Sequence, residues 1–113
     1  MHEIGVLVKA VNMVEEISKE QQIDQIQFVT LEVGELTGYL PVFFEKYWEI
    51  VTEDIECLRG AELKIQTVRG QALCRECQTL YNVMRQKGRC PKCGSREKKI
   101  LSGEQFLVKN IEY

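Results

Sequence analysis

Four cysteines near the C-terminal end constrain the fold more than any other feature of the chain. They form two pairs, Cys74 with Cys77 and Cys90 with Cys93, with two residues inside each pair and twelve between the pairs. Two tight turns with this spacing can place four sulfur atoms around one tetrahedral ion. We therefore predict a structural Zn²⁺ site in a zinc-ribbon module, with these four residues as the ligands.

Two other uses of these cysteines stay open from the residues alone. The run CPKCG at 90–94 also occurs in rubredoxin-like iron sites, although the spacing between the pairs is short for that fold. Disulfide pairing is the second alternative. Five cysteines in a chain expected to be cytoplasmic suit metal thiolates plus one spare thiol, Cys57, better than disulfides. A four-thiolate site has no open position for a substrate, so we expect no catalytic zinc.

The composition is that of a small globular protein. The 113 residues are 44% hydrophobic and 28% charged, which is enough for one modest core. No apolar run approaches the ~20 residues of a membrane span. The first twenty residues carry four glutamates and no basic segment, so no secretory signal is expected either. We predict a cytoplasmic protein without a membrane partner.

The net charge of −2 divides into two regions of opposite sign. Residues 1–68 hold five Lys/Arg against thirteen Asp/Glu, whereas residues 69–100 hold nine against two. Opposite charges suggest two modules with different surfaces. We predict an α/β domain of residues 1–68 plus 101–113, with a zinc-ribbon domain of residues 69–100 inserted between two of its strands.

Hydrophobic periodicity gives the fold class. Apolar residues recur at helical spacing over 4–17 and again after Pro41, while segments 26–33, 63–67 and 105–111 have strand character. Segment 26–33 has apolar residues of both parities, so both faces are partly covered or the strand contains a bulge. The prediction is α+β: a small mixed three-stranded sheet with two helices, plus the zinc ribbon. The second helix has an apolar stripe expected in the core: Phe44, Tyr47, Trp48 and Val51, with Phe43 and Ile50 beside it.

The N-terminus offers a second possible metal site. His2 is the single histidine of the chain. An imidazole in second position can bind Ni²⁺ or Cu²⁺ together with the free amine and the intervening amide nitrogen, and Glu3 could add an oxygen. From these residues alone, an exposed terminal histidine is the simpler interpretation. With one histidine and no Gly-rich phosphate loop, we predict no enzyme.

Several motifs together resemble the HypA/HybF family of hydrogenase nickel-insertion proteins. They are the start Met1-His2-Glu3 before an amphipathic helix, the segments LEVGEL at 31–36 and GAEL at 60–63, the two cysteine pairs, and LVKNIE at 107–112. They occur in collinear order over essentially the whole chain. The resemblance implies a nickel metallochaperone that works with the GTPase of the maturation pathway and delivers Ni²⁺ to the large subunit of nickel-iron hydrogenase.

The resemblance also implies residue roles. Met1, His2 and Glu3 would bind the transported nickel, and the four cysteines would hold structural Zn²⁺. Some relatives carry an acidic residue in the loop after the Gly-Glu-Leu segment, where this chain has Tyr39-Leu40. Cys57 matches no motif and is expected to be a buried small residue.

The alternative is a zinc-ribbon module for nucleic-acid or protein docking. The basic region 69–100 could contact phosphates. Residues 1–68 are strongly acidic, however, and Tyr81 is the one evident stacking platform in the ribbon, so nucleic acid is not expected. The same basic surface could instead steer docking onto an acidic protein partner.

Overall fold

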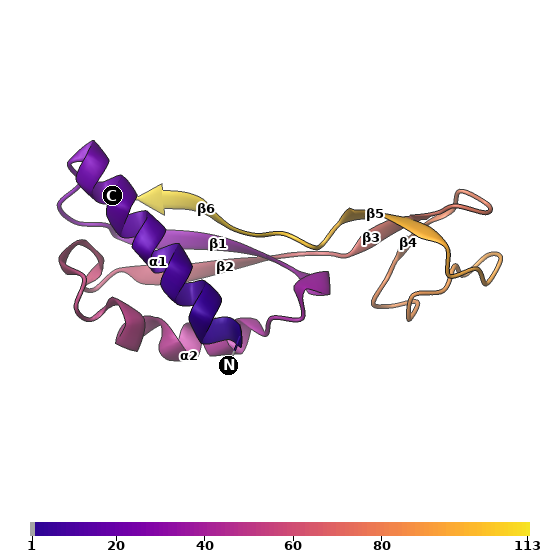
Figure 1. Ribbon diagram of the computed structural model, residues 1–113, viewed down its shortest axis with the longest axis horizontal. Helices are drawn as coiled ribbons and strands as arrows, with labels where there is room; N and C mark the ends of the chain where they lie inside the picture. Colours follow the sequence, from indigo (N-terminus) through magenta and orange to yellow (C-terminus); the bar gives the residue numbers. More distant parts are fainter. Residues whose placement is uncertain (1) are drawn as a thin grey trace. The chain divides into compact units, whose positions relative to one another are not determined.

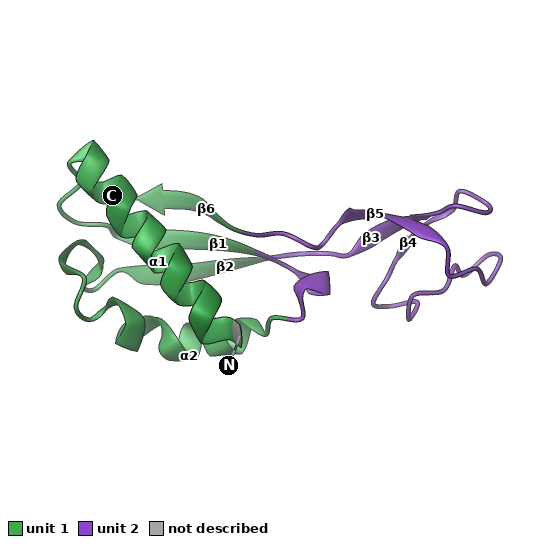
Figure 2. Ribbon diagram, viewed as in Figure 1, with its two compact units in different colours: residues 1–32, 39–66, 107–113 green, residues 33–38, 67–106 purple. Residues whose placement is uncertain are grey.

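The computed structural model describes residues 2–113, with side chains from residue 3 onward (Figure 1). Met1 and the side chain of His2, both named above as nickel ligands, lie outside what is described. By their internal contacts the residues form two compact units, unit 1 with residues 1–32, 39–66 and 107–113, and unit 2 with residues 33–38 and 67–106 (Figure 2). The elements are α1 (His2–Gln21), β1 (Phe28–Gly34), η1 (Glu35–Thr37), α2 (Pro41–Thr52), η2 (Glu56–Leu58), β2 (Glu62–Val68), β3 (Gln71–Cys74), β4 (Leu80–Asn82), β5 (Lys98–Ser102) and β6 (Phe106–Glu112).

The two helices pack against each other in unit 1. Pro41 occupies the first position of α2, where its missing N–H breaks no helical hydrogen bond. The buried residues of α2 recur every fourth position, at Phe44, Trp48 and Thr52. Ile50 is 62% exposed, so its predicted place beside the buried stripe is wrong. It follows Trp48 by two residues, which places it about 200° around the helix from the core.

The sheet of order β2-β1-β6 is the mixed three-stranded sheet predicted from the sequence. Figure 1 shows β1 and β2 running in the same direction and β6 returning against them. Val29, Leu31 and Val33 of β1 are each 1% exposed and form the buried face of this strand. Ile26 is also buried but precedes β1, and Lys64 Nζ lies 3.9 Å from the ring centre of Phe28. Ile26 therefore lies before the strand, and Phe28 lies on its second, half-buried face.

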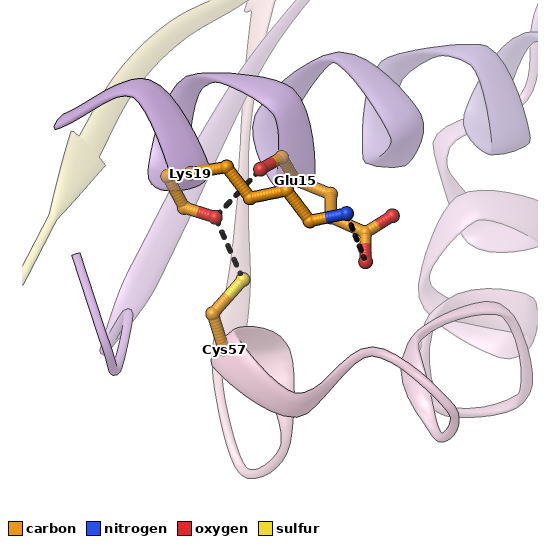
Figure 3. A network of polar contacts seen from close by, with 4 residues as sticks. Glu15, Lys19 and Cys57 are labelled. Atoms are coloured by element: carbon orange, nitrogen blue, oxygen red, sulfur yellow. Dashed lines mark hydrogen bonds and ion pairs between the residues drawn. The ribbon is translucent and has the colours of Figure 1, made fainter. Parts of the chain in front are cut away.

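Cys57 is buried in unit 1, as expected (Figure 3). Its Sγ lies 3.2 Å from Oγ of Ser18, a buried residue of α1. The Ser18 hydroxyl donates to the Glu15 carbonyl at 2.7 Å, and Lys19 Nζ lies 3.9 Å from the Glu15 carboxylate. The thiol is thus a contact between α1 and η2 within the core of unit 1.

Unit 2 contains a second, antiparallel sheet of order β4-β3-β5. Its buried cluster is small and consists of Ala72, Cys74, Tyr81 and Cys90. Residues 33–38 pack within this unit. A Cβ added to Gly34 would lie 2.0 Å from the Gly103 carbonyl oxygen, so the two backbones meet where no side chain fits. Among the described residues, no helix has the length and apolar character needed to span a bilayer.

Candidate metal centre

The four cysteines of the two pairs come together in unit 2. Cys74 ends β3, Cys77 lies in the turn that follows, and Cys90 and Cys93 belong to the loop between β4 and β5. All four sulfur atoms lie within 4.8 Å of one another. The Sγ atoms of Cys74 and Cys93 are 3.5 Å apart, as are those of Cys77 and Cys90.

These distances suit one tetrahedral zinc ion. With Zn–S bonds of about 2.3 Å, the sulfur atoms of a tetrahedron are ~3.8 Å apart, within the range seen here. A disulfide would need about 2.05 Å between the sulfurs, and none of the described cysteines is paired in this way. The donor set therefore fits Zn²⁺, and a tetrahedron closed by four protein sulfurs holds no position for substrate or water.

The two turns that carry the cysteines have the same backbone hydrogen bonds. In the first, the Cys74 N–H donates to the Thr79 carbonyl and the Gln78 N–H donates to the Cys74 carbonyl, both at 2.9 Å. In the second, the Cys90 N–H donates to the Ser95 carbonyl and the Gly94 N–H to the Cys90 carbonyl, again at 2.9 Å. Each pair is thus held by backbone hydrogen bonds within its own turn.

Hydrogen bonds to the sulfurs favour thiolates at two positions. The Thr79 hydroxyl, 3.2 Å from Cys77 Sγ, lowers the pKa of that thiol, against the opposing effect of burial. Burial raises the pKa of Cys90, but backbone N–H groups at Cys93 and Lys92 together with the Cys77 thiol outweigh it and lower this pKa to about 6. The Lys92 N–H lies 3.4 Å from Cys90 Sγ.

Cys93 has the opposite shift. The Ser95 backbone N–H lowers its pKa, but burial and the other three sulfurs outweigh that hydrogen bond and raise the pKa to about 12. The sulfurs are so close that they do not all ionise together at neutral pH unless a cation compensates their charge. This is the electrostatic arrangement expected of a divalent metal site, because the ion makes four thiolates compatible.

Tyr81 does not serve as a stacking platform. Its side chain is 5% exposed and lies in the cluster with Ala72 and two of the cysteines, and its hydroxyl donates to the Gly88 carbonyl at 3.5 Å. Its role suggested from the sequence, as the one aromatic platform for bases, is therefore wrong. It is needed instead as the largest apolar side chain in a core that is otherwise too small.

His2 and Glu3 are the first residues of α1 in unit 1. The helix begins at His2, and the half-buried Glu3 accepts a hydrogen bond from the Leu40 N–H, with 3.2 Å between Leu40 N and Glu3 Oε2. The loop after Gly38 is thus in contact with the first turn of α1. Among the side chains of residues 3–113, the four cysteines are the one group of three or more His, Cys, Asp or Glu residues close enough to share an ion.

Sequence reasoning missed two features of these sites. Thr79 and Ser95 shape the two cysteine turns, and a signal for them exists, since CRECQT and CPKCGS align as an internal repeat. The Leu40 contact with Glu3 joins residues 37 positions apart and has no local signal.

Known proteins resemble this chain along its whole length. Residues 1–113 match the sequence model of a family described as hydrogenase/urease nickel incorporation, metallochaperone, hypA. The chain is 31% identical to the hydrogenase maturation factor HypA of Acidithiobacillus ferrooxidans and 34% identical to that of Geobacter sulfurreducens. Each alignment spans 112 residues and covers 99% of this chain and 98% of the relative. The resemblance inferred from the motifs is confirmed.

Solved structures share the fold. The solution structure of the Ni metallochaperone HypA from Helicobacter pylori superposes with a TM-score of 0.69 at 23% identity, covering 97% of this chain and 95% of that one. A second solution structure, of a HypA protein, gives a TM-score of 0.71 at 25% identity, with 99% and 95% covered. The matched family is one of metallochaperones, which confirms the prediction that the chain is not an enzyme.

Proposed function

The chain belongs to the HypA family of hydrogenase/urease nickel-incorporation metallochaperones, and on this premise we propose that it carries Ni²⁺ at its N-terminus and delivers it to the large subunit of nickel-iron hydrogenase. The observation that supports the proposal is the start of α1. The helix begins at His2, and Glu3 in its first turn accepts a hydrogen bond from the backbone N–H of Leu40.

The donor set at this end is suited to nickel. The terminal amine, the His2 amide nitrogen and the His2 imidazole are nitrogen ligands that favour the square-planar geometry of Ni²⁺. The first N–H groups of a helix have no acceptor within it. Because α1 begins at His2, a metal can replace the amide proton there without breaking a helical hydrogen bond.

Glu3 is the candidate oxygen ligand. A carboxylate has several acceptor positions, so one hydrogen bond from the Leu40 N–H leaves it able to approach a cation. Neither Tyr39 nor Leu40 in this loop has an acidic side chain to offer the metal. We propose that the loop contributes to the nickel site through its backbone, by orienting Glu3.

The four cysteines are proposed to hold structural Zn²⁺. The support is the sulfur geometry, with every sulfur within 4.8 Å of the others, and the small size of the cluster around it. The proposal places the protein in the cytoplasm, where reduced thiols are available for a metal.

Delivery requires a site that releases its cargo. A site of few ligands at a chain end can exchange them one at a time with a recipient, unlike a closed four-thiolate site. The proposed partners are the maturation GTPase and the hydrogenase large subunit. Each recipient would have to bring its own metal ligands close to the N-terminal end of α1.

Metal content of purified variants tests the proposal. The wild type and His2→Ala are loaded with nickel, desalted and analysed for zinc and nickel, and nickel affinity is measured by calorimetry. We expect both to keep zinc and His2→Ala to lose nickel. A second variant with four residues added before Met1 keeps His2 but moves the amine too far from the imidazole for both to chelate one ion, and it should lose nickel as well.

The matched control is Gly5→Ala, a change in the same helix where an added Cβ meets nothing within 4 Å. It should bind nickel like the wild type. Unchanged nickel affinity in His2→Ala would rule out the N-terminal site.

A further inference from the structure

The sheet of unit 2 has a buried inner face. Ala72 is paired with Tyr81 of β4 and with Ile100 of β5. Residues directly opposite each other on antiparallel strands point to the same face of a sheet. Ala72 and Tyr81 belong to the buried cluster that also contains cysteine ligands, and Ile100 packs against it. This face is therefore filled by the metal site and its small core.

The next row of the same sheet must point the other way, because side chains alternate along a strand. Leu73 follows Ala72 and is paired with Leu80 on one side and Lys99 on the other. Leu80 is 64% exposed and Lys99 is also exposed. Leu101 is 50% exposed and lies at the register irregularity of β5. An apolar row with a cationic end thus runs across the outer face of the sheet.

We propose that this outer face, made of Leu73, Leu80, Leu101 and Lys99 and called the leucine face, docks an apolar protein surface that is bordered by acidic residues. The inference rests on the proposed function in one respect, that the docked protein is a partner in hydrogenase maturation. Nickel binding at the N-terminus is not required for it.

The basic region that carries the leucine face favours an acidic partner. Residues 69–100 carry nine Lys/Arg and two Glu. Arg75 follows β3, and its Nε donates to the Lys98 carbonyl at 3.1 Å, which keeps a second positive charge beside the sheet. Positive charge around an apolar centre accelerates encounter with an acidic surface and opposes docking to a basic one.

The size and chemistry of the leucine face further restrict the class of partner that it can bind. Three leucines on a short sheet offer far less than the roughly 1,600 Å² of a standard stable interface, so the contact is transient, as delivery requires. Sequence-independent binding of single-stranded nucleic acid uses exposed aromatic rings. The leucine face has none, and Tyr81 is buried on the opposite side of the sheet. An acidic protein surface is therefore favoured over nucleic acid.

Binding to two purified proteins tests the inference. The probes are the hydrogenase large-subunit precursor and the maturation GTPase of the same organism, and the analyte is the full zinc-loaded chain. We expect the wild type to bind at least one of them, with an affinity that falls as salt rises, and binding to neither would overturn the inference. Leu80→Asp should lower that affinity about tenfold or more, because it places a charge in the apolar centre. Lys99→Glu should lower it and flatten the salt dependence.

The matched control is Ile50→Asp, because Ile50 is an equally exposed apolar residue of unit 1 at 62%. It should leave the affinity unchanged. Zinc content and helix signal verify folding, and Leu101→Asp replaces Leu80→Asp if the latter loses zinc. The inference would be overturned if Ile50→Asp and the leucine variants lost equal affinity for the protein probe, or if the leucine variants lost none. It would also be overturned if the leucine variants lost affinity for mixed-sequence RNA and not for the protein probes.

Nickel loading of the same variants separates this inference from the proposed function. Leu80→Asp should bind nickel normally. If Leu80→Asp weakens docking while His2→Ala keeps nickel, the leucine face stands and the N-terminal nickel site fails. If His2→Ala loses nickel while Leu80→Asp docks normally, the leucine face fails and the nickel site stands.

Discussion

Gln78 and Gly94 occupy the same position in the two cysteine turns, one residue after the second cysteine of each pair. Both have left-handed backbones, with φ of 63° and 78°. The N–H of each donates to the carbonyl of the first cysteine in its pair at 2.9 Å. A left-handed conformation costs an L-residue roughly 1–2 kcal/mol and costs glycine little, so the first turn carries strain that the second lacks.

Gln78→Gly should therefore stabilise unit 2. The gain from relieving the positive φ exceeds the added flexibility of the unfolded chain, and we expect about 0.5–1 kcal/mol. Tighter zinc retention against a competing chelator and a higher urea midpoint would show it. The reciprocal change, Gly94→Ala, should cost about 1 kcal/mol through the backbone alone, because an added Cβ there meets nothing within 4 Å.

Gln86→Gly is the control for replacing a glutamine by glycine at a position without positive φ. Gln86 is not among the residues with positive φ, so glycine there adds only flexibility and should lower stability slightly. Equal effects of glycine at positions 78 and 86 would contradict the strain argument.

Removal of zinc should unfold unit 2 and leave unit 1 folded. Two of the four residues in the buried cluster of unit 2 are the proposed zinc ligands Cys74 and Cys90, so little apolar core remains without the ion. The core of unit 1 contains large buried side chains such as Leu7, Ile26 and Phe44 and none of the four proposed zinc ligands. Structural Zn²⁺ contributes on the order of 10 kcal/mol to folding of such modules.

Hydrogen exchange after chelation is the measurement. Amides of β3 and β4 should lose protection, while those of α1 and the helix signal in circular dichroism should persist. Cys57→Ser provides the control, since Cys57 is the one cysteine outside the cluster and its variant should keep zinc. Loss of helix on chelation would contradict the independence of the two cores.

The features predicted correctly from the sequence are those that depend on residues close together in the chain. The spacing of the cysteines, the apolar period of α1 and the position of Pro41 act within a few residues, and each produced the expected element. The two cysteine turns depend on hydrogen bonds between residues at most five apart, which also makes them predictable from sequence. The strain at Gln78 was missed because no glycine marks the position.

Contacts between distant segments explain the rest. The pairing of β5 with β3 joins Lys98 to Cys74, and no local sequence signal predicts it. Residues 33–38 pack within unit 2 although they lie far from it in the chain: the Glu35 carboxylate accepts from the Gly70 N–H at 3.3 Å and from Asn82 Nδ2 at 3.5 Å. The domain boundaries drawn at 68/69 and 100/101 stay predictions.

Gly34→Ala should disrupt this packing severely. The new Cβ would lie 2.0 Å from the Gly103 carbonyl oxygen and 2.3 Å from its carbon, and both are backbone atoms that no rotamer change can move. The Gly34 N–H also donates to the Gln105 carbonyl at 2.8 Å, so separating the strands would lose hydrogen bonds as well. We expect a loss of about 2–4 kcal/mol in the free energy of unfolding, typical of overpacking with backbone displacement.

Gly5→Ala gives a control with the same chemical change and the opposite expected sign. Gly5 is an exposed residue within α1, its added Cβ meets nothing within 4 Å, and alanine favours a helix over glycine by up to about 1 kcal/mol. Thermal unfolding of both variants should therefore lower the midpoint for Gly34→Ala and raise it for Gly5→Ala. If Gly34→Ala melts like the wild type, the close approach of the backbones at Gly34 and Gly103 does not hold residues 33–38 in unit 2.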